Sequence, residues 1–243
     1  MKGKKSSSNS GIVLLGCILI FQFLPVSAQV DIPDSIITER IKTIQMILNQ
    51  GQPGANQWWY VWLAGYSAGM VAQGTVYFIS DDLSTRQDMA LGAATAFLGA
   101  AGQLLTPRVP GYAADRLILI PDSSPGERQI KLSRAEELLK ASAMTQKAGR
   151  SWKVHVIFGA VNLSSGLITW LAFKRTVWAG VGNFALNTVI TETQIWTQPT
   201  RILKDYQNYC RKYSSGAEVL DNKPGLNWFV GVYPGGIGIK LVF

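Results

Sequence analysis

Charged residues are scarce in this sequence, and their scarcity limits the class of protein. Of its 243 residues, 16% are charged and 47% are hydrophobic, whereas an ordinary soluble domain has about 25% charged residues. Intrinsic disorder is disfavoured, because a disordered chain has few apolar residues and a high charge content. The length suits one sizeable domain. The composition therefore favours a membrane protein or a bundle of heavily buried helices.

The sequence also has little of what enzymes and nucleic-acid-binding proteins use. It lacks a GxxxxGK[ST] phosphate loop and a GxGxxG fingerprint that opens a helix after a strand, and nothing places a nucleophile on a strained turn. One histidine without a cysteine cluster offers no ligand set for a metal. We therefore predict no catalytic residue, metal or cofactor. The net charge of +8 is spread along the chain rather than gathered in one basic patch, so nucleic acid is not an expected partner.

Cysteine is nearly absent, and one of the two cysteines lies in a predicted export signal. Residues 1–28 have a basic head, an apolar body and small residues before Gln29, where we expect cleavage. Removal of Cys17 with this segment leaves Cys210 alone, so no internal disulfide is expected. In a rival interpretation, residues 14–17 resemble a bacterial lipobox and Cys17 becomes a lipidated N-terminus. The predicted localisation is the cell envelope, membrane-associated and facing the periplasm.

Two apolar segments in the first half of the mature chain predict a helical hairpin. A short amphipathic helix is expected over residues 34–51, ended by a break at 52–54. Residues 58–79 then contain no charge and would span about 33 Å as a helix, enough for a hydrocarbon core of about 30 Å. A turn and a predicted capping box that begins at Ser84 lead into a second apolar helix at about 89–105. Glycines on both helices favour close packing.

The second half predicts an amphipathic helix and another apolar hairpin. Ser124 and Glu127 form a capping box that begins a helix over about 125–148. Apolar helices are expected at about 153–173 and 176–198, joined at Lys174 and Arg175. In the alternative interpretation, one long helix runs through this basic pair.

The tail differs from the body, because residues 228–233 and 237–243 read as two strands joined by a turn. The predicted division is therefore a signal at 1–28, a helical domain at 29–215 and a tail with a β-hairpin at 216–243. The predicted fold class is mainly α, a helical bundle with two apolar Gly/Ala-rich hairpins embedded in a membrane, an amphipathic helix between them and a small C-terminal β-hairpin.

Polar residues inside the second hairpin form the candidate site. His155 and Asn162 share one helix face, and Asn183, Asn187 and Glu192 belong to the next helix. We predict that Asn162 meets Asn183 or Asn187 across the hairpin. Such amides usually join helices. In the functional alternative they line a polar cavity in which His155 or Glu192 titrates.

Two functions follow from these features. The leading prediction is a non-enzymatic membrane-associated scaffold or assembly component, with membrane lipid and another copy or an envelope protein as partners. The alternative is an exported soluble bundle that binds or acts on a hydrophobic or amphipathic ligand through the His155/Asn162 seam. The alternative is kept because residues 106–150 are rich in Lys and Arg, and four spans after an exported N-terminus would place them outside, against the positive-inside tendency.

Overall fold

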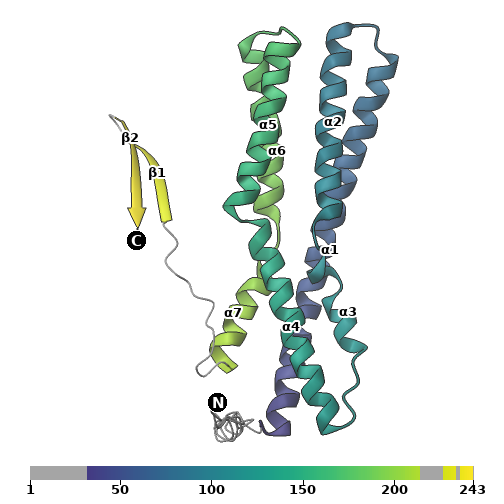
Figure 1. The fold of residues 1–243 in the computed structure, drawn as a ribbon, viewed down its shortest axis with the longest axis vertical. Helices are drawn as coiled ribbons and strands as arrows, with labels where there is room; N and C mark the ends of the chain where they lie inside the picture. Colours follow the sequence, from purple (N-terminus) through teal and green to yellow (C-terminus); the bar gives the residue numbers. More distant parts are fainter. Residues whose placement is uncertain (1–31, 214–226, 234–235, 243) are drawn as a thin grey trace, which may run out of the picture. The chain divides into compact units, whose positions relative to one another are not determined.

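The structure is a computed structural model that describes residues 32–213, 227–233 and 236–242. The predicted export signal, the cleavage before Gln29 and the lipobox at Cys17 lie outside these residues. The described chain is mainly helical (Figure 1). Its elements are α1 (Asp34–Ile79), α2 (Leu83–Leu105), η1 (Val109–Gly111), α3 (Ala113–Ile118), α4 (Pro125–Gly149), α5 (Trp152–Leu167), η2 (Ile168–Ala172), α6 (Val177–Thr197), α7 (Arg201–Tyr213), β1 (Asn227–Tyr233) and β2 (Gly236–Val242).

A hydrophobic core lies where the first part of α1 packs with α3, α4 and α7, which we call the base bundle (residues 34–51, 113–118, 125–149 and 201–213). Ile37, Ile41, Ile44 and Leu48 recur on one face of α1 and are all buried, as helical periodicity requires. The predicted amphipathic helix is α4, and the capping box of Ser124 and Glu127 that begins it is confirmed.

One helix replaces the two that were predicted over residues 34–79, so the predicted break at 52–54 is wrong. Gly51 does not terminate the helix. It allows Ile202 of α7 to approach, since a Cβ on Gly51 would stand 2.3 Å from Ile202 Cγ1. The amide of Gln52 donates to the carbonyl oxygen of Gly111 at 3.1 Å and to Asp115 at 2.7 Å. These tertiary contacts hold α1 helical through Pro53.

Two antiparallel hairpins extend from the base bundle (Figure 1). The first hairpin consists of residues 58–79 of α1 with α2. Its second helix begins at Leu83, capped by Asp82, whose carboxylate accepts from the amide of Thr85 at 2.7 Å. The predicted start at Ser84 is therefore wrong, because the acidic residue before it makes the cap.

The second hairpin consists of α5, η2 and α6. The alternative of one long helix through Lys174 and Arg175 is wrong, because the chain turns there and Lys174 has a positive φ of 55°. Before this turn, η2 is a π-helical segment in which the amide of Phe173 donates to the carbonyl oxygen of Ile168 at 3.0 Å. In the tail, β1 and β2 pair antiparallel, with Tyr233 opposite Gly236.

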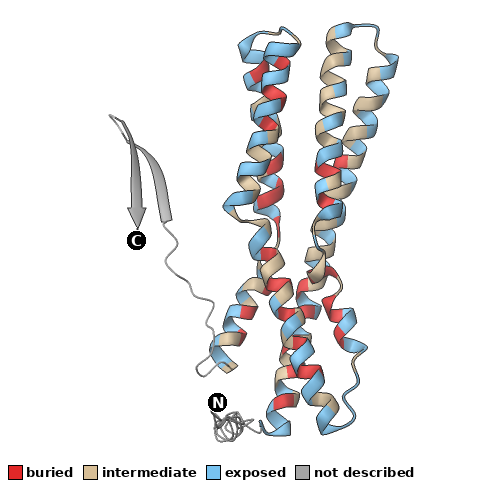
Figure 2. Ribbon diagram, viewed as in Figure 1, coloured by how far each residue is buried: buried red, intermediate tan, exposed pale blue. Residues whose placement is uncertain are grey.

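Burial differs between the base bundle and the hairpins (Figure 2). Buried apolar side chains concentrate in the base bundle, whereas large apolar side chains on the hairpins are exposed. Among them, Phe78 is 83% exposed, Trp178 77% and Leu186 63%. On the surface of an ordinary soluble protein, large apolar side chains are scattered singly, whereas here many of them are exposed on the same helices.

Candidate functional site

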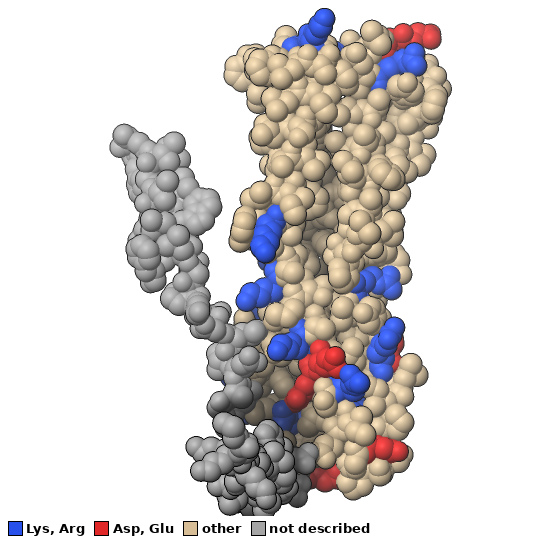
Figure 3. Space-filling view, in the orientation of Figure 1, with Lys and Arg blue, Asp and Glu red and all other residues tan. Residues whose placement is uncertain are grey.

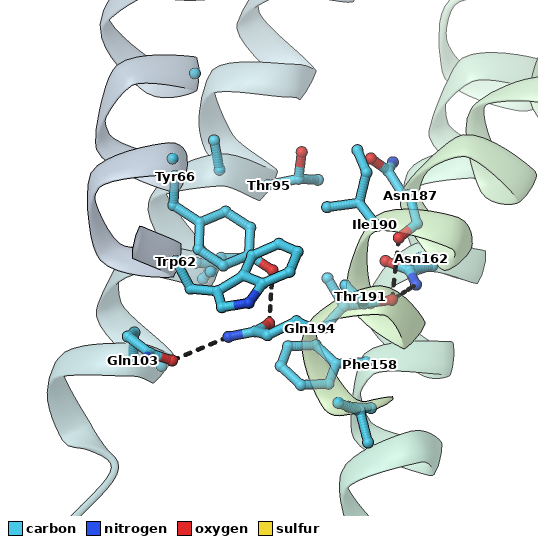
Figure 4. Close-up of a pocket in the computed structure, with 18 of the residues that line it drawn as sticks. Trp62, Tyr66, Thr95, Gln103, Phe158, Asn162, Asn187, Ile190, Thr191 and Gln194 are labelled. Carbon is cyan, nitrogen blue, oxygen red and sulfur yellow. Dashed lines mark hydrogen bonds between the residues drawn. The ribbon is translucent and has the colours of Figure 1, made fainter. Parts of the chain in front are cut away.

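A cleft of about 1470 Å³ lies between the two hairpins (Figures 3 and 4). Its first wall is rich in small residues from α1 and α2, including Gly65, Gly69 and Gly92. Its second wall carries larger apolar side chains from α5 and α6, such as Phe158 and Ile190, interrupted by amides. An apolar cleft with a few convergent polar groups is the usual form of a ligand site.

Buried glutamines lie across the cleft (Figure 4), and beyond them the lining continues toward the base bundle, to Met144 and Thr145 of α4. The hydroxyl of Tyr66 donates to Oε1 of Gln194 at 2.7 Å, and Nε2 of Gln194 donates to Oε1 of Gln103 at 2.9 Å. Gln103 in turn donates to the carbonyl oxygen of Trp59 at 3.2 Å. The side chains of Tyr66, Gln103 and Gln194 are almost fully buried. Each hydrogen bond therefore offsets the cost of burying a polar group. This network joins the first hairpin to the second.

An ion pair joins the hairpins at their turn ends. Arg175 Nη2 lies 3.4 Å from Asp88 Oδ2, with the two side chains 27% and 45% exposed. Arg175 and Asp88 are the two charged residues of the cleft lining, and they face each other. The hydrogen-bonded amides thus cross the cleft on the side of the base bundle, and the neutralised ion pair joins its walls near the turns.

The second wall contains three of the predicted site residues, but their pairing differs from the prediction. Asn162 donates to Thr191 Oγ1 at 2.9 Å and to Thr188 Oγ1 at 3.4 Å, not to Asn183 or Asn187. The two remaining asparagines converge instead on Ser165, which donates to Asn183 at 2.6 Å and accepts from Asn187 at 3.3 Å. Several polar side chains lie near Asn162 in the facing helix, and the sequence alone does not determine which of them it meets.

His155 and Glu192 form a separate pair outside the cleft lining. His155 Nδ1 lies 2.9 and 3.0 Å from the two carboxylate oxygens of Glu192, and Trp196 Nε1 donates to the same carboxylate at 3.1 Å. The side chains of His155 and Glu192 are 29% and 34% exposed. The predicted seam therefore divides into a half-buried histidine–carboxylate pair and a separate group of hydrogen-bonded amides, of which Asn162 is buried. The described residues contain no group of three or more His, Cys, Asp and Glu that could hold a metal.

Residues 65–69 read Gly-Tyr-Ser-Ala-Gly, which matches the GxSxG pattern of serine hydrolases. The prediction from sequence counted this pattern as absent and was wrong on this point. In those enzymes the serine stands on a sharp turn between a strand and a helix. Here Ser67 lies in the interior of α1, without a hydrogen bond to a histidine or carboxylate among the described residues. Its position therefore does not support a nucleophile.

Comparison of this chain with protein-family models, with curated proteins and with solved structures finds no match. The arguments for its function accordingly rest on its own residues and their arrangement.

Proposed function

We propose that this protein is a non-enzymatic, membrane-associated scaffold or assembly component of a bacterial-type cell envelope, with its two hairpins inserted in a lipid bilayer. The observation that carries the proposal is the exposed apolar surface of the hairpins. The helix α2 and the segment Trp152–Ala172 are long and apolar enough to cross a membrane, and only 22% of the residues in each apolar window are buried. A core helix of a soluble protein would be mostly buried.

The distribution of charge supports insertion of the hairpins in a membrane. Residues 43–80 contain no charged side chain, and neither do residues 89–107, 154–173 and 176–191. Charged side chains lie beyond both ends of this uncharged zone (Figure 3). The shortest run, of 16 residues, would span about 24 Å as a helix, so the hairpins fit a bilayer that is locally thin.

Aromatic side chains lie at the two ends of the uncharged zone, where amphipathic rings settle at a membrane interface. At the end next to the base bundle, Arg108 stacks on Trp59 and Tyr60, with its guanidinium 5.0 and 5.1 Å from their ring centroids. At the other end, Arg86 lies 4.9 Å from the ring centroid of Tyr77. Cation–π pairs at both ends are typical of groups that face lipid head groups on one side and acyl chains on the other.

Each hairpin leaves the base bundle and returns to it, so insertion would place the base bundle on one side of the membrane and both turns on the other. Predicted export places the base bundle in the periplasm. The excess of Lys and Arg in residues 106–150 favours the opposite orientation, so orientation requires its own measurement.

Membrane fractionation tests the proposal directly. The full chain should stay with membranes washed in alkaline carbonate and should float with vesicles. Recovery as a monodisperse protein without detergent would contradict insertion. The orientation of the hairpins can be measured with variants that carry a single cysteine, Asp82→Cys or Lys140→Cys, each combined with Cys210→Ser. A membrane-impermeant maleimide added to intact spheroplasts should modify only one of these positions, and modification of both would exclude four spans.

The scaffold role has support from the exposed apolar faces of the hairpins, which offer a contact surface for a second copy or an envelope protein. Cross-linking in intact cells, followed by mass determination of the products, tests it. A scaffold should give a discrete homo- or hetero-oligomer. Recovery of the chain as a monomer under all cross-linking conditions would contradict the role.

A further inference from the structure

We propose that the cleft between the hairpins binds one elongated, uncharged lipid that carries carbonyl or hydroxyl oxygens within an otherwise apolar body. This inference rests on the proposed membrane insertion, because the lipid would enter the cleft from the bilayer.

The charges of the lining indicate an uncharged occupant. Asp88 and Arg175 pair with each other at one end, and the remaining lining residues are uncharged. A charged head group inside the cleft would lose its hydration without gaining a partner of opposite charge. A lipid whose body is neutral avoids that cost.

The dimensions indicate a long molecule. A volume of about 1470 Å³ exceeds the roughly 300–1,000 Å³ of most small-molecule sites. Asp88 and Gln103 both line the cleft and lie fifteen residues apart along α2, which is about 22 Å at 1.5 Å per residue, so the cleft is at least that long. The occupant is therefore of membrane-lipid size and lies along the hairpins.

Polar side chains between Asp88 and Gln103 indicate where the occupant carries its oxygen atoms. Gln73 lines the cleft, and its side chain lies across Gly92, where a Cβ would stand 1.5 Å from Gln73 Oε1. Its amide has no hydrogen-bond partner among the described residues, in contrast to the paired Gln103 and Gln194. An unpaired amide surrounded by acyl chains costs free energy, so an oxygen of the occupant that accepts from Gln73 would be stabilising.

The wall formed by α5 and α6 carries an amide at the same position along the hairpins as Gln73. Tyr66 of α1 and Gln194 of α6 are hydrogen-bonded across the cleft. Gln73 lies seven residues from Tyr66 along α1, and Asn187 lies seven residues from Gln194 along α6, both in the direction away from the base bundle. Both positions are about 10 Å from that hydrogen bond, because the two helices rise equally per residue. Asn187 also lines the cleft. Polar groups of the occupant would thus meet amides from both hairpins at one level.

Glycine substitutions test occupancy without disturbing the fold. Gly65 and Gly182 line the cleft on opposite walls, and a Cβ at either has no neighbour within 4 Å. Leucine at both positions would narrow the cleft from both walls. Gly74 and Gly159 have equally open surroundings but do not line the cleft. The double variant Gly74→Leu/Gly159→Leu is therefore the matched control.

The probe is a diacylglycerol with a diazirine on one acyl chain, in vesicles of phosphatidylethanolamine and phosphatidylglycerol that contain the full chain. Photolabelling should map to peptides that line the cleft, and Gly65→Leu/Gly182→Leu should reduce it about tenfold. The control variant should label like the wild type. Gln73→Leu should reduce labelling by diacylglycerol but not by a diazirine alkane that has no oxygen.

Four results would overturn the proposal: equal labelling of the cleft and control variants, equal effects of Gln73→Leu on both probes, stronger labelling by a phosphatidylglycerol with the same chain, or a cross-link to a second copy that only the cleft variant abolishes. The last would mean that a protein helix occupies the cleft. Flotation of the same samples separates these outcomes from failure of membrane insertion. A chain that floats but is not labelled contradicts only the lipid site.

Discussion

Gly166 of α5 and Gly180 of α6 lie against each other so closely that neither can carry a side chain. A Cβ on Gly166 would stand 2.7 Å from the carbonyl oxygen of Gly180, and a Cβ on Gly180 would stand 2.6 Å from that of Gly166. This mutual contact of two backbones joins the helices of the second hairpin near its turn. Small residues at such a crossing allow two helix backbones to approach closely.

Substitution of Gly166 should therefore weaken the second hairpin. Because the clashing atom belongs to the backbone, Gly166→Ala should separate the helices and destabilise the hairpin by about 1–3 kcal/mol. Gly159→Ala on the same helix meets open space and should be neutral or stabilising, since alanine favours a helix over glycine by about 1 kcal/mol. Unfolding in mixed micelles measures both changes. Equal stability of the two variants would contradict direct contact at the crossing.

The hydrogen bond between Asn162 and Thr191 should couple the same two helices. Asn162→Leu should cost about 0.5–2 kcal/mol. The double variant Asn162→Leu/Thr191→Val should cost less than the sum of the single changes, because it leaves neither polar group without its partner. Additive effects in this double-mutant cycle would show that the 2.9 Å contact contributes nothing measurable.

Stability of the base bundle should depend on pH through Asp122. A hydrogen bond from Lys131, whose side chain is 7% exposed, lowers the pKa of Asp122 below its usual value. A lowered pKa means that the folded state prefers the ionised carboxylate. Its stabilising effect is thus present above the unfolded pKa of about 4 and is lost as the pH falls through the folded value.

Asp122→Asn should reduce protection of α4 amides against hydrogen exchange at neutral pH and flatten its decrease toward acid. Glu137→Gln is the control, because Glu137 pairs with Arg134 where both side chains are more than 60% exposed, and such pairs contribute little. An unchanged acid profile in Asp122→Asn would contradict the role of the Lys131 pair.

Local sequence patterns predicted the helical hairpins well but not the contacts between them. Uncharged runs identified the four hairpin helices, and the signature at Ser124 identified the start of α4, because both depend on neighbouring residues. Gly51 was misread as a helix terminator, since its true neighbour is Ile202 in a distant helix. The role of Gln103 was missed for a similar reason. A glutamine in an apolar helix signals a buried partner, but sequence does not show which one, and the cleft itself arises from the spacing of two hairpins.

The contact between Gly51 and Ile202 gives the sharpest test of the continuous helix α1. A Cβ on Gly51 would stand 2.3 and 2.5 Å from Cγ1 and Cδ1 of Ile202, a side chain that is fully buried. Gly51→Ala should therefore destabilise the base bundle by about 1–3 kcal/mol through overpacking, reduced by the helix preference of alanine of about 1 kcal/mol.

Gly54→Ala on the same helix is the matched comparison, because its Cβ would meet only Pro199 Cγ, at 4.0 Å. In a continuous helix this change should stabilise the protein by about 0.5–1 kcal/mol. Ile202→Ala should partly rescue Gly51→Ala, because it removes both clashing atoms, Cγ1 and Cδ1, and leaves only Cβ, 3.8 Å away. The double variant should therefore be more stable than additivity predicts. If Gly51→Ala and Gly54→Ala destabilise the chain equally and Ile202→Ala gives no rescue, the segment at 52–54 breaks the helix and the packing of Ile202 on Gly51 is refuted.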